Sequence, residues 1–158
     1  MGFFGNLLGN KDKTESCHFR NGALIQSDER REALNSGNLD RMLKHLYSKG
    51  DIVDTHFLYL QLIDQAYSRR KEPKMRILFK KLANEHVEKF GSIREQLIKQ
   101  LGILPRVPTF QYLATVYTED CEYEKAIEVC EKAIAFGLHD GTKGGFHGRI
   151  ERIAKKIK

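Results

Sequence analysis

The sequence predicts an all-α protein. Apolar residues recur at steps of three and four along most of the chain, which is the period of one face of an α-helix. Glycine and proline stand between these stretches, where helices end and begin. The one β-type signal is a pair of short runs, CHFR and ALIQ, on either side of Asn21 and Gly22. That dipeptide is typical of a tight hairpin turn.

Residues 1–26 are predicted to form an N-terminal tail that can include this short hairpin, and residues 27–158 to form a single helical domain. Near the start of the chain (MGFFGNLLGNKDK), four apolar residues stand at helical spacing and polar residues follow. They are Phe3, Phe4, Leu7 and Leu8. Two interpretations stay open: a frayed tail, or a small amphipathic anchor that touches a membrane or a partner.

The first two helices of the domain are predicted between residues 27 and 50. Ser27 is the expected N-cap, and the acidic residues Asp28 and Glu29 suit the first turn of a helix. Gly37 interrupts this helix. The apolar stripe of the next helix consists of Leu39, Met42, Leu43, Leu46 and Tyr47.

Two longer helices follow and are expected to pack as a hairpin. The third has the stripe Phe57, Leu60, Ile63 and Tyr67; the fourth begins near Pro73 and has the stripe Met75, Leu78, Phe79, Leu82 and Val87. Ser92 and Glu95 then match a capping box, which predicts a separate short helix after them. Residues 102–108 (GILPRVP) are a linker, because proline cannot continue a helix.

Three helices are predicted in the remainder of the chain. The first two form another hairpin, with the stripes Phe110, Leu113, Ala114, Tyr117 and Ala126, Ile127, Cys130, Ala133, Ile134, and Gly137 is a natural stop. The last has the stripe Phe146, Ile150, Ile153, Ala154 and Ile157. Two helices approach closely only where their side chains are small, which gives Ala114, Ala126 and Ala133 a packing role.

The order of large and small residues in this hairpin resembles a tetratricopeptide repeat (TPR), over roughly 34 residues, 107–140. The positions that stand at family-like spacings are Leu113, Ala114, Tyr117, Tyr123, Ala126 and Ala133. The segment departs from the family at Cys121, where a turn Gly is common, and it lacks the usual Pro after the second helix. The resemblance implies a short right-handed array of antiparallel helix hairpins, with the last helix as a C-terminal cap.

A shift of 50 residues reproduces part of the pattern. Leu60, Ile63, Tyr67 and Ala83 then correspond to Phe110, Leu113, Tyr117 and Ala133. Asp64 and Arg76 replace the small Ala114 and Ala126, so the earlier hairpin is a degenerate repeat, and the helix expected after Ser92 is an insertion. The alternative, an irregular helical bundle, stays open.

The residues that carry chemistry show no known catalytic or metal-binding spacing. Three cysteines without close spacing indicate no disulfide framework and favour a reducing cytoplasm, and no apolar run is long enough to span a membrane. The six histidines form no metal motif and are expected on the surface or half-buried. The loop GTKGG lacks the Lys-Ser/Thr ending of a phosphate-binding loop. The sequence therefore predicts a cytoplasmic protein that is not an enzyme and has no cofactor.

The TPR resemblance implies a module that binds a peptide or helix of a partner protein in a groove lined by the first helices of successive hairpins. On those helices, the positions out of phase with the apolar stripes are polar and uncharged. They are Gln61, Gln65 and Ser68, with Arg69 beside them, and Gln111, Thr115 and Thr118. These seven residues are the predicted groove, and a solvated face is the alternative interpretation.

The charge distribution supports a second hypothesis. The segment RRKEPKMRILFKK holds seven basic residues against one Glu: Arg69, Arg70, Lys71, Lys74, Arg76, Lys80 and Lys81. Such a segment can bind nucleic acid or an anionic surface by neutralising phosphates. Between Glu119 and Glu131, six acidic residues stand against Lys125 alone. Pairing of the acidic and basic segments between copies, which is self-association, stays open as well.

Overall fold

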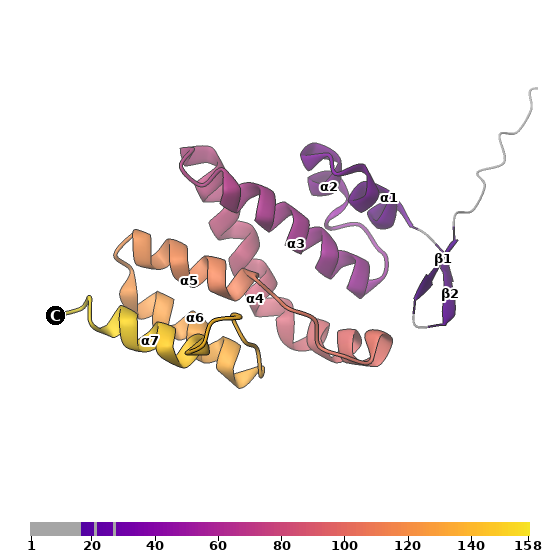
Figure 1. Ribbon diagram of the computed structural model, residues 1–158. Helices are drawn as coiled ribbons and strands as arrows, with labels where there is room; N and C mark the ends of the chain where they lie inside the picture. Colours follow the sequence, from indigo (N-terminus) through magenta and orange to yellow (C-terminus); the bar gives the residue numbers. More distant parts are fainter. Residues whose placement is uncertain (1–16, 21, 27) are drawn as a thin grey trace, which may run out of the picture.

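The computed structural model describes residues 17–20, 22–26 and 28–158. In this part of the chain, helices make up most of the regular structure, which confirms the predicted all-α class (Figure 1). The helices are α1 Glu29–Ser36, α2 Leu39–His45, α3 Ile52–Ser68, α4 Pro73–Leu101, α5 Thr109–Glu119, α6 Tyr123–Ala135 and α7 Gly145–Ala154. The apolar residues between Met1 and Lys13 and the predicted cap at Ser27 lie outside the described residues.

The predicted hairpin is present. Strand β1 (Cys17–Arg20) pairs antiparallel with β2 (Ala23–Gln26), and Arg20 lies opposite Ala23, so the turn contains two residues. Gly22 has a φ of 79°, a left-handed conformation that glycine adopts without a steric penalty. The Asn-Gly signal therefore identified this turn correctly.

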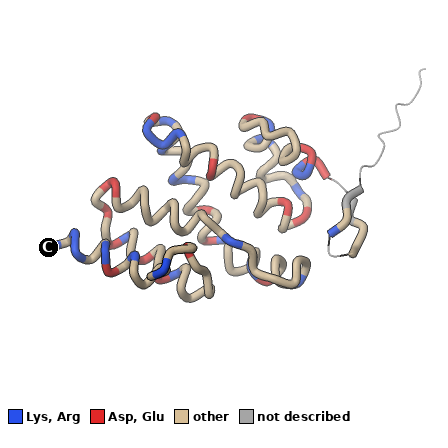
Figure 2. Tube along the Cα trace, in the orientation of Figure 1, with Lys and Arg blue, Asp and Glu red and all other residues tan. Residues whose placement is uncertain are grey.

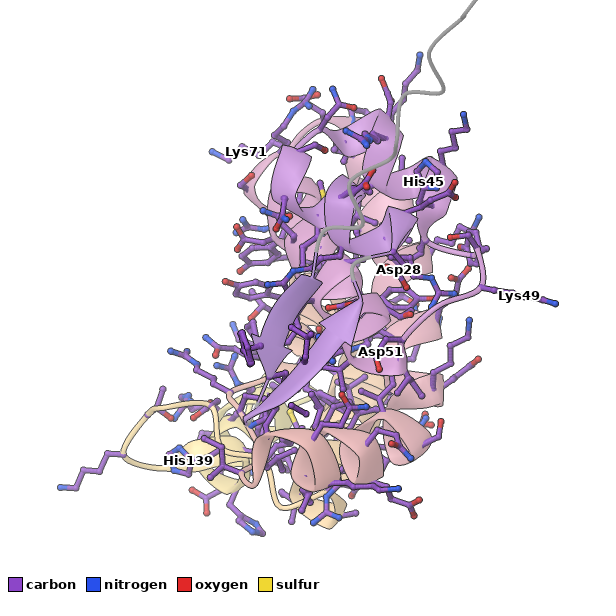
Figure 3. The ribbon with its side chains drawn as sticks, turned by 90° about the vertical axis from the view of Figure 1, so that its right-hand side faces the viewer. Asp28, His45, Lys49, Asp51, Lys71 and His139 are labelled. Atoms are coloured by element: carbon purple, nitrogen blue, oxygen red, sulfur yellow. The ribbon has the colours of Figure 1, made fainter. Side chains whose placement is uncertain are left out.

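Arg20 anchors the hairpin to the helical domain. Its side chain is only 6% exposed, and its guanidinium bonds the carboxylates of Asp51 (2.6 Å) and Asp54 (2.5 Å) and the side chain of Gln100 (2.7 Å). Burial alone raises the pKa of Asp51, but the bonds from Arg20, from the Asp54 N–H and from Gln100 outweigh burial and lower it. Figure 3 looks onto the hairpin, with Asp28 and Asp51 beside it.

Each helix packs mainly on its neighbours in the sequence. The most extensive contacts join α3 to α4, α5 to α6 and α6 to α7, and α1 contacts both α2 and α3. From α3 to α7 the helices run alternately in opposite directions (Figure 1). The predicted hairpins α3–α4 and α5–α6 are therefore both present, and they share one apolar core.

The prediction of a separate helix after Ser92 is wrong. Helix α4 continues without a break for 29 residues, and the Ser92 hydroxyl donates to the carbonyl of Lys89 instead of capping a new helix. The buried residues Phe90, Ile93 and Leu97 continue the apolar stripe across this region. Because no proline interrupts the stripe, the helix does not end until Gly102, whose φ is 74°.

Helix α2 is shorter than the predicted stripe, which included Tyr47. It ends at His45, and Tyr47 is 57% exposed, with its hydroxyl donating to Glu85 (2.7 Å). Asp28 is a side-chain cap of α1, since it accepts a hydrogen bond from the N–H of Arg31 (3.0 Å). Sequence periodicity gave the correct helices here but not their ends.

The α5–α6 hairpin has the predicted packing. Ala114, Ala126 and Ala133 are completely buried, as small residues at a close helix contact should be. In the turn, Cys121 has a φ of 59°, and the N–H of Glu122 bonds the carbonyl of Tyr117 (2.8 Å). This is the bonding pattern that ends many helices at a glycine. Cys121 therefore adopts a left-handed conformation that glycine takes more readily than other residues.

Helix α7 covers α6 with the predicted stripe, since Phe146 and Ile153 are buried and Ile150 is half-buried, although Ile157 is 48% exposed. None of the helices in the described ranges has both the length and the apolar content needed to cross a membrane.

Candidate functional site

A hollow of about 490 Å³ lies between α1 and α3, beside the start of α5. We call it the α1–α3 hollow. It is lined by Arg31, Leu34 and Asn35 of α1, by Phe57, Leu60, Gln61 and Asp64 of α3, and by Pro108. Its volume falls within the range of pockets that bind small molecules and cofactors.

Helical spacing places these residues on the hollow. The α1 residues are three and four apart, and the α3 residues stand at positions i, i+3, i+4 and i+7, so each set lies on one side of its helix. The half-buried apolar side chains Leu34, Phe57 and Leu60 pack on the core from here. The hollow thus has an apolar floor.

Polar groups surround this floor. The Arg31 guanidinium bonds the buried carboxylate of Asp54 (3.3 Å), and Asp64 accepts a hydrogen bond from the Tyr112 hydroxyl (3.3 Å). The Gln61 side-chain oxygen Oε1 is buried and has no hydrogen-bond partner among the described residues. A buried acceptor without a partner is energetically costly, and because Oε1 is closed to solvent, a donor in the hollow reaches it only when the Gln61 side chain turns toward the hollow.

The other predicted groove residues on α3 have partners within the chain. The amide of Gln65 donates to the carbonyl of Gly37 (3.1 Å), and the Ser68 hydroxyl donates to the carbonyl of Gln65 (2.8 Å). Arg69 forms an exposed ion pair with Glu72 (2.9 Å). Of the predicted α3 set, Gln61 is the residue that lines the hollow.

The predicted groove residues on α5 lie in a different environment. Gln111 accepts a hydrogen bond from Arg106 (3.1 Å). Thr115 and Thr118 line a second hollow of about 340 Å³ between α5 and α7. Its other lining residues are Glu119, Arg149, Arg152, Ile153 and Lys156. The seven predicted residues are therefore divided between two hollows and several local contacts.

The basic segment of α4 pairs with the acidic turn between α5 and α6. Arg70 and Arg76 contact Glu119 at 2.9 and 3.2 Å, and Arg76 contacts Asp120 at 2.6 Å. Lys80 pairs with Asp120 and with Glu122. Figure 2 shows the blue turn between α3 and α4 near the red turn between α5 and α6.

These contacts change the proton affinity of the acidic groups. The hydrogen bond from Arg70 is the largest influence on Glu119, and together with Arg76 it lowers the pKa of this carboxyl despite partial burial. Three cations of the segment, Lys71, Lys74 and Lys81, are exposed and form no ion pair with other described residues. The charge that is left for phosphates is thus much smaller than the sequence suggests.

Two histidines are completely buried, whereas the sequence indicated half-buried or surface positions. His56 Nδ1 lies 2.9 Å from His86 Nε2, and His86 Nδ1 lies 2.8 Å from the hydroxyl of Thr109. The His86 ring stacks on Tyr59 with centroids 5.1 Å apart. Burial lowers the pKa of His56 to about 4 and also lowers the pKa of His86. The pair joins α3, α4 and α5, and spacing gave no signal for it because its members are 30 residues apart.

No group of three or more metal-ligating side chains occurs within residues 17–20, 22–26 and 28–158. Cys130 is buried, and burial raises the pKa of its thiol to about 11, which disfavours the reactive thiolate. The α1–α3 hollow therefore remains the best candidate site in the described chain. Comparisons with protein-family models, with curated proteins and with solved structures found no match.

Proposed function

We propose that the chain is a non-catalytic protein-interaction module and that its α1–α3 hollow binds a segment of a partner protein. The observation that supports this proposal is the position of the hollow. It is bounded by α1, by α3 and by Pro108, the residue before α5. Helices α1, α3 and α5 are the first helices of the successive pairs α1–α2, α3–α4 and α5–α6. Solenoid proteins bind their partners on the surface formed by such helices.

The proposal includes a TPR-like array with α7 as its C-terminal cap. In its support, helices pack chiefly on sequence neighbours, and the three alanines of the α5–α6 hairpin are buried. The aromatic rings of Tyr67 on α3 and Tyr112 on α5 stack with centroids 4.0 Å apart. Contacts of this kind between first helices hold neighbouring repeats together.

The hollow's chemistry defines the segment that it suits. One or two apolar side chains of the partner pack on Leu34, Phe57 and Leu60, and a backbone or amide N–H donates to Gln61 Oε1 once the Gln61 side chain turns toward the hollow. Each apolar side chain contributes about 1.5–3 kcal/mol and the hydrogen bond about 0.5–1.5 kcal/mol. Association costs offset part of this gain, so we expect dissociation constants of roughly 10 µM to 1 mM.

A peptide-display screen tests this function. Random 12-residue peptides are selected on the wild-type chain, and each enriched peptide is then measured on a Leu60→Arg variant, which places a charge on the floor of the hollow. The control is Ile77→Arg, because Ile77 lies on α4 and is 71% exposed. We expect enriched peptides with paired apolar residues that bind wild type and control but lose at least about tenfold in affinity on Leu60→Arg. A screen that enriches no peptide, or peptides that bind all three chains equally, contradicts the proposal.

A further inference from the structure

The α1–α3 hollow lies close to the point at which residues 1–16 join the described chain. Arg20 of β1 and Arg31 of the hollow both bond the same oxygen, Asp54 Oδ1, at 2.5 and 3.3 Å. One buried carboxylate therefore separates the hairpin from the wall of the hollow. Arg20 also bonds Asp51 and Gln100, which holds β1 at this position.

The preceding segment is long enough to reach the hollow. Twelve residues lie between Phe4 and Cys17, and an extended chain of that length spans up to about 40 Å. The distance along α3 from Asp54 to Leu60 is much shorter, roughly 9 Å for six residues of helix. The strand from Cys17 to Arg20, which contacts Asp54, adds three residue steps, about 10 Å, so the whole path stays within this reach and docking needs no displacement of the hairpin.

The composition of this segment matches the hollow. Its apolar residues are gathered in Phe3, Phe4, Leu7 and Leu8, and the rest of the sixteen residues are mostly polar or glycine. The floor of the hollow is apolar, so these four side chains are of the kind that pack on it.

We propose that residues 3–8 (FFGNLL) dock in the α1–α3 hollow of their own chain. A partner segment must then displace them before it binds. This regulatory consequence rests on the proposed function, whereas the docking itself does not. For a tethered segment, the effective concentration is on the order of millimolar. If residues 3–8 bind the hollow with an intrinsic dissociation constant near 100 µM, they therefore weaken partner binding about tenfold.

Photo-crosslinking in the full chain tests the docking. The photoreactive residue p-benzoylphenylalanine replaces Phe4, and a mixture of light and ¹⁵N-labelled chains distinguishes links within one chain from links between chains. We expect links within one chain to peptides that contain residues 31–35 or 57–64. The links should disappear in Leu60→Arg and persist in the control Ile77→Arg.

The remaining outcomes overturn the docking. Links that join light to heavy chains show that a second copy takes up the segment. Links to lipid, when phosphatidylcholine–phosphatidylserine vesicles are added, together with loss of the protein links, show a membrane anchor. Links to other parts of the chain, or none, also contradict the proposal.

A second measurement does not depend on the folding of Leu60→Arg. Phe3→Ser/Phe4→Ser changes residues outside the described core, and we expect it to bind a display-selected peptide about tenfold more tightly than wild type. Lys11→Ser/Lys13→Ser is the matched control and should bind like wild type. Equal binding by both variants contradicts the docking but leaves the proposed function intact. If the crosslinks form within one chain but the display screen enriches no peptide, the docking holds and the proposed function is contradicted.

Discussion

At the scale of single residues, Gly50 shows how a close contact fixes a residue type. A Cβ at this position would overlap Asp28 Oδ2. That carboxylate accepts hydrogen bonds from the N–H of Arg31 (3.0 Å) and from the N–H of Asp51 (3.2 Å), and so it links the start of α1 to the start of α3. A side chain at position 50 would therefore displace a carboxylate that bonds the N-terminal ends of both α1 and α3.

Gly50→Ala should destabilise the protein by about 1–2 kcal/mol, because the Asp28 carboxylate must move and the α1 cap is lost. Urea unfolding measures the change. Gly91→Ala is the control, since the nearest contact of its Cβ is Phe136 at an ordinary 3.8 Å and the site lies inside α4. It should stabilise by up to about 1 kcal/mol through helix propensity. A neutral Gly50→Ala would mean that the Asp28 contacts contribute little.

Cys121→Gly should stabilise the protein by about 0.5–1 kcal/mol, because it relieves a left-handed conformation that costs a residue with a Cβ more than it costs glycine. Cys121→Ala keeps the Cβ and should change stability by less than about 0.5 kcal/mol. Thermal and urea unfolding of the two variants make the comparison. If both variants match wild type, the turn is not strained at this residue.

At the scale of helices and strands, local signals predicted which elements exist, and tertiary contacts decided where they end. The Asn-Gly turn and the apolar stripes of α3 to α7 gave the correct elements. The capping box at Ser92 failed because the buried Phe90, Ile93 and Leu97 favour one continuous α4. A side-chain cap stabilises a helix end by less than the burial of several apolar residues stabilises a continuous helix, so the helix continues here.

The site was less predictable than the elements, because tertiary contacts also decide which polar groups are left to line it. Gln61 lines the α1–α3 hollow, whereas the amide of Gln65 donates to Gly37 at the end of α1. The partner of each polar group depends on helices far away in the sequence. Arg20 and Asp54 are 34 residues apart, and His56 and His86 are 30 apart. No local spacing encodes such pairs.

The buried histidines predict a pH dependence of stability. The pKa of His56 is about 4 in the folded chain and near 6.5 in the unfolded chain, and that of His86 is also lowered. As the pH falls below about 6.5, the unfolded chain binds protons that the folded chain excludes. The free energy of unfolding should therefore decrease by about 1.4 kcal/mol per pH unit for each histidine.

Urea unfolding between pH 7.5 and 5 measures this loss. His147→Gln is the control, because His147 is exposed and its replacement should leave the slope unchanged. Carboxylates such as Glu119, whose pKa is lowered, titrate below this range. A free energy of unfolding that stays constant from pH 7.5 to 5 would show that the histidine pair is accessible to protons.

At the scale of the whole molecule, long-range ion pairs join parts of the chain that the sequence keeps apart. The basic segment at the α3–α4 turn and the start of α4 pairs with the acidic turn after α5, so part of the uneven charge along the sequence is neutralised within the fold. Arg20 has the same role at the other end of the molecule, where it joins the hairpin to α3 and α4.

Arg20→Ala should destabilise the fold by roughly 3 kcal/mol, because it leaves the buried Asp54 with fewer partners. Hydrogen exchange should also show the strongest loss of protection in the hairpin. The control Arg41→Ala removes an ion pair with Glu32 in which both side chains are about half exposed, and it should cost less than about 1 kcal/mol. Equal effects of the two variants would contradict the anchoring role of Arg20.

The central claim is that a partner segment binds in the α1–α3 hollow, and methyl NMR on the full chain tests it most directly. A display-selected peptide is added to protein with labelled Leu and Ile methyl groups. We expect the largest chemical-shift changes at Leu34 and Leu60, with little change at the core residue Leu82 or at Ile153, which lines the hollow between α5 and α7. A bound peptide that shifts Ile153 but leaves Leu34 and Leu60 unchanged contradicts the claim.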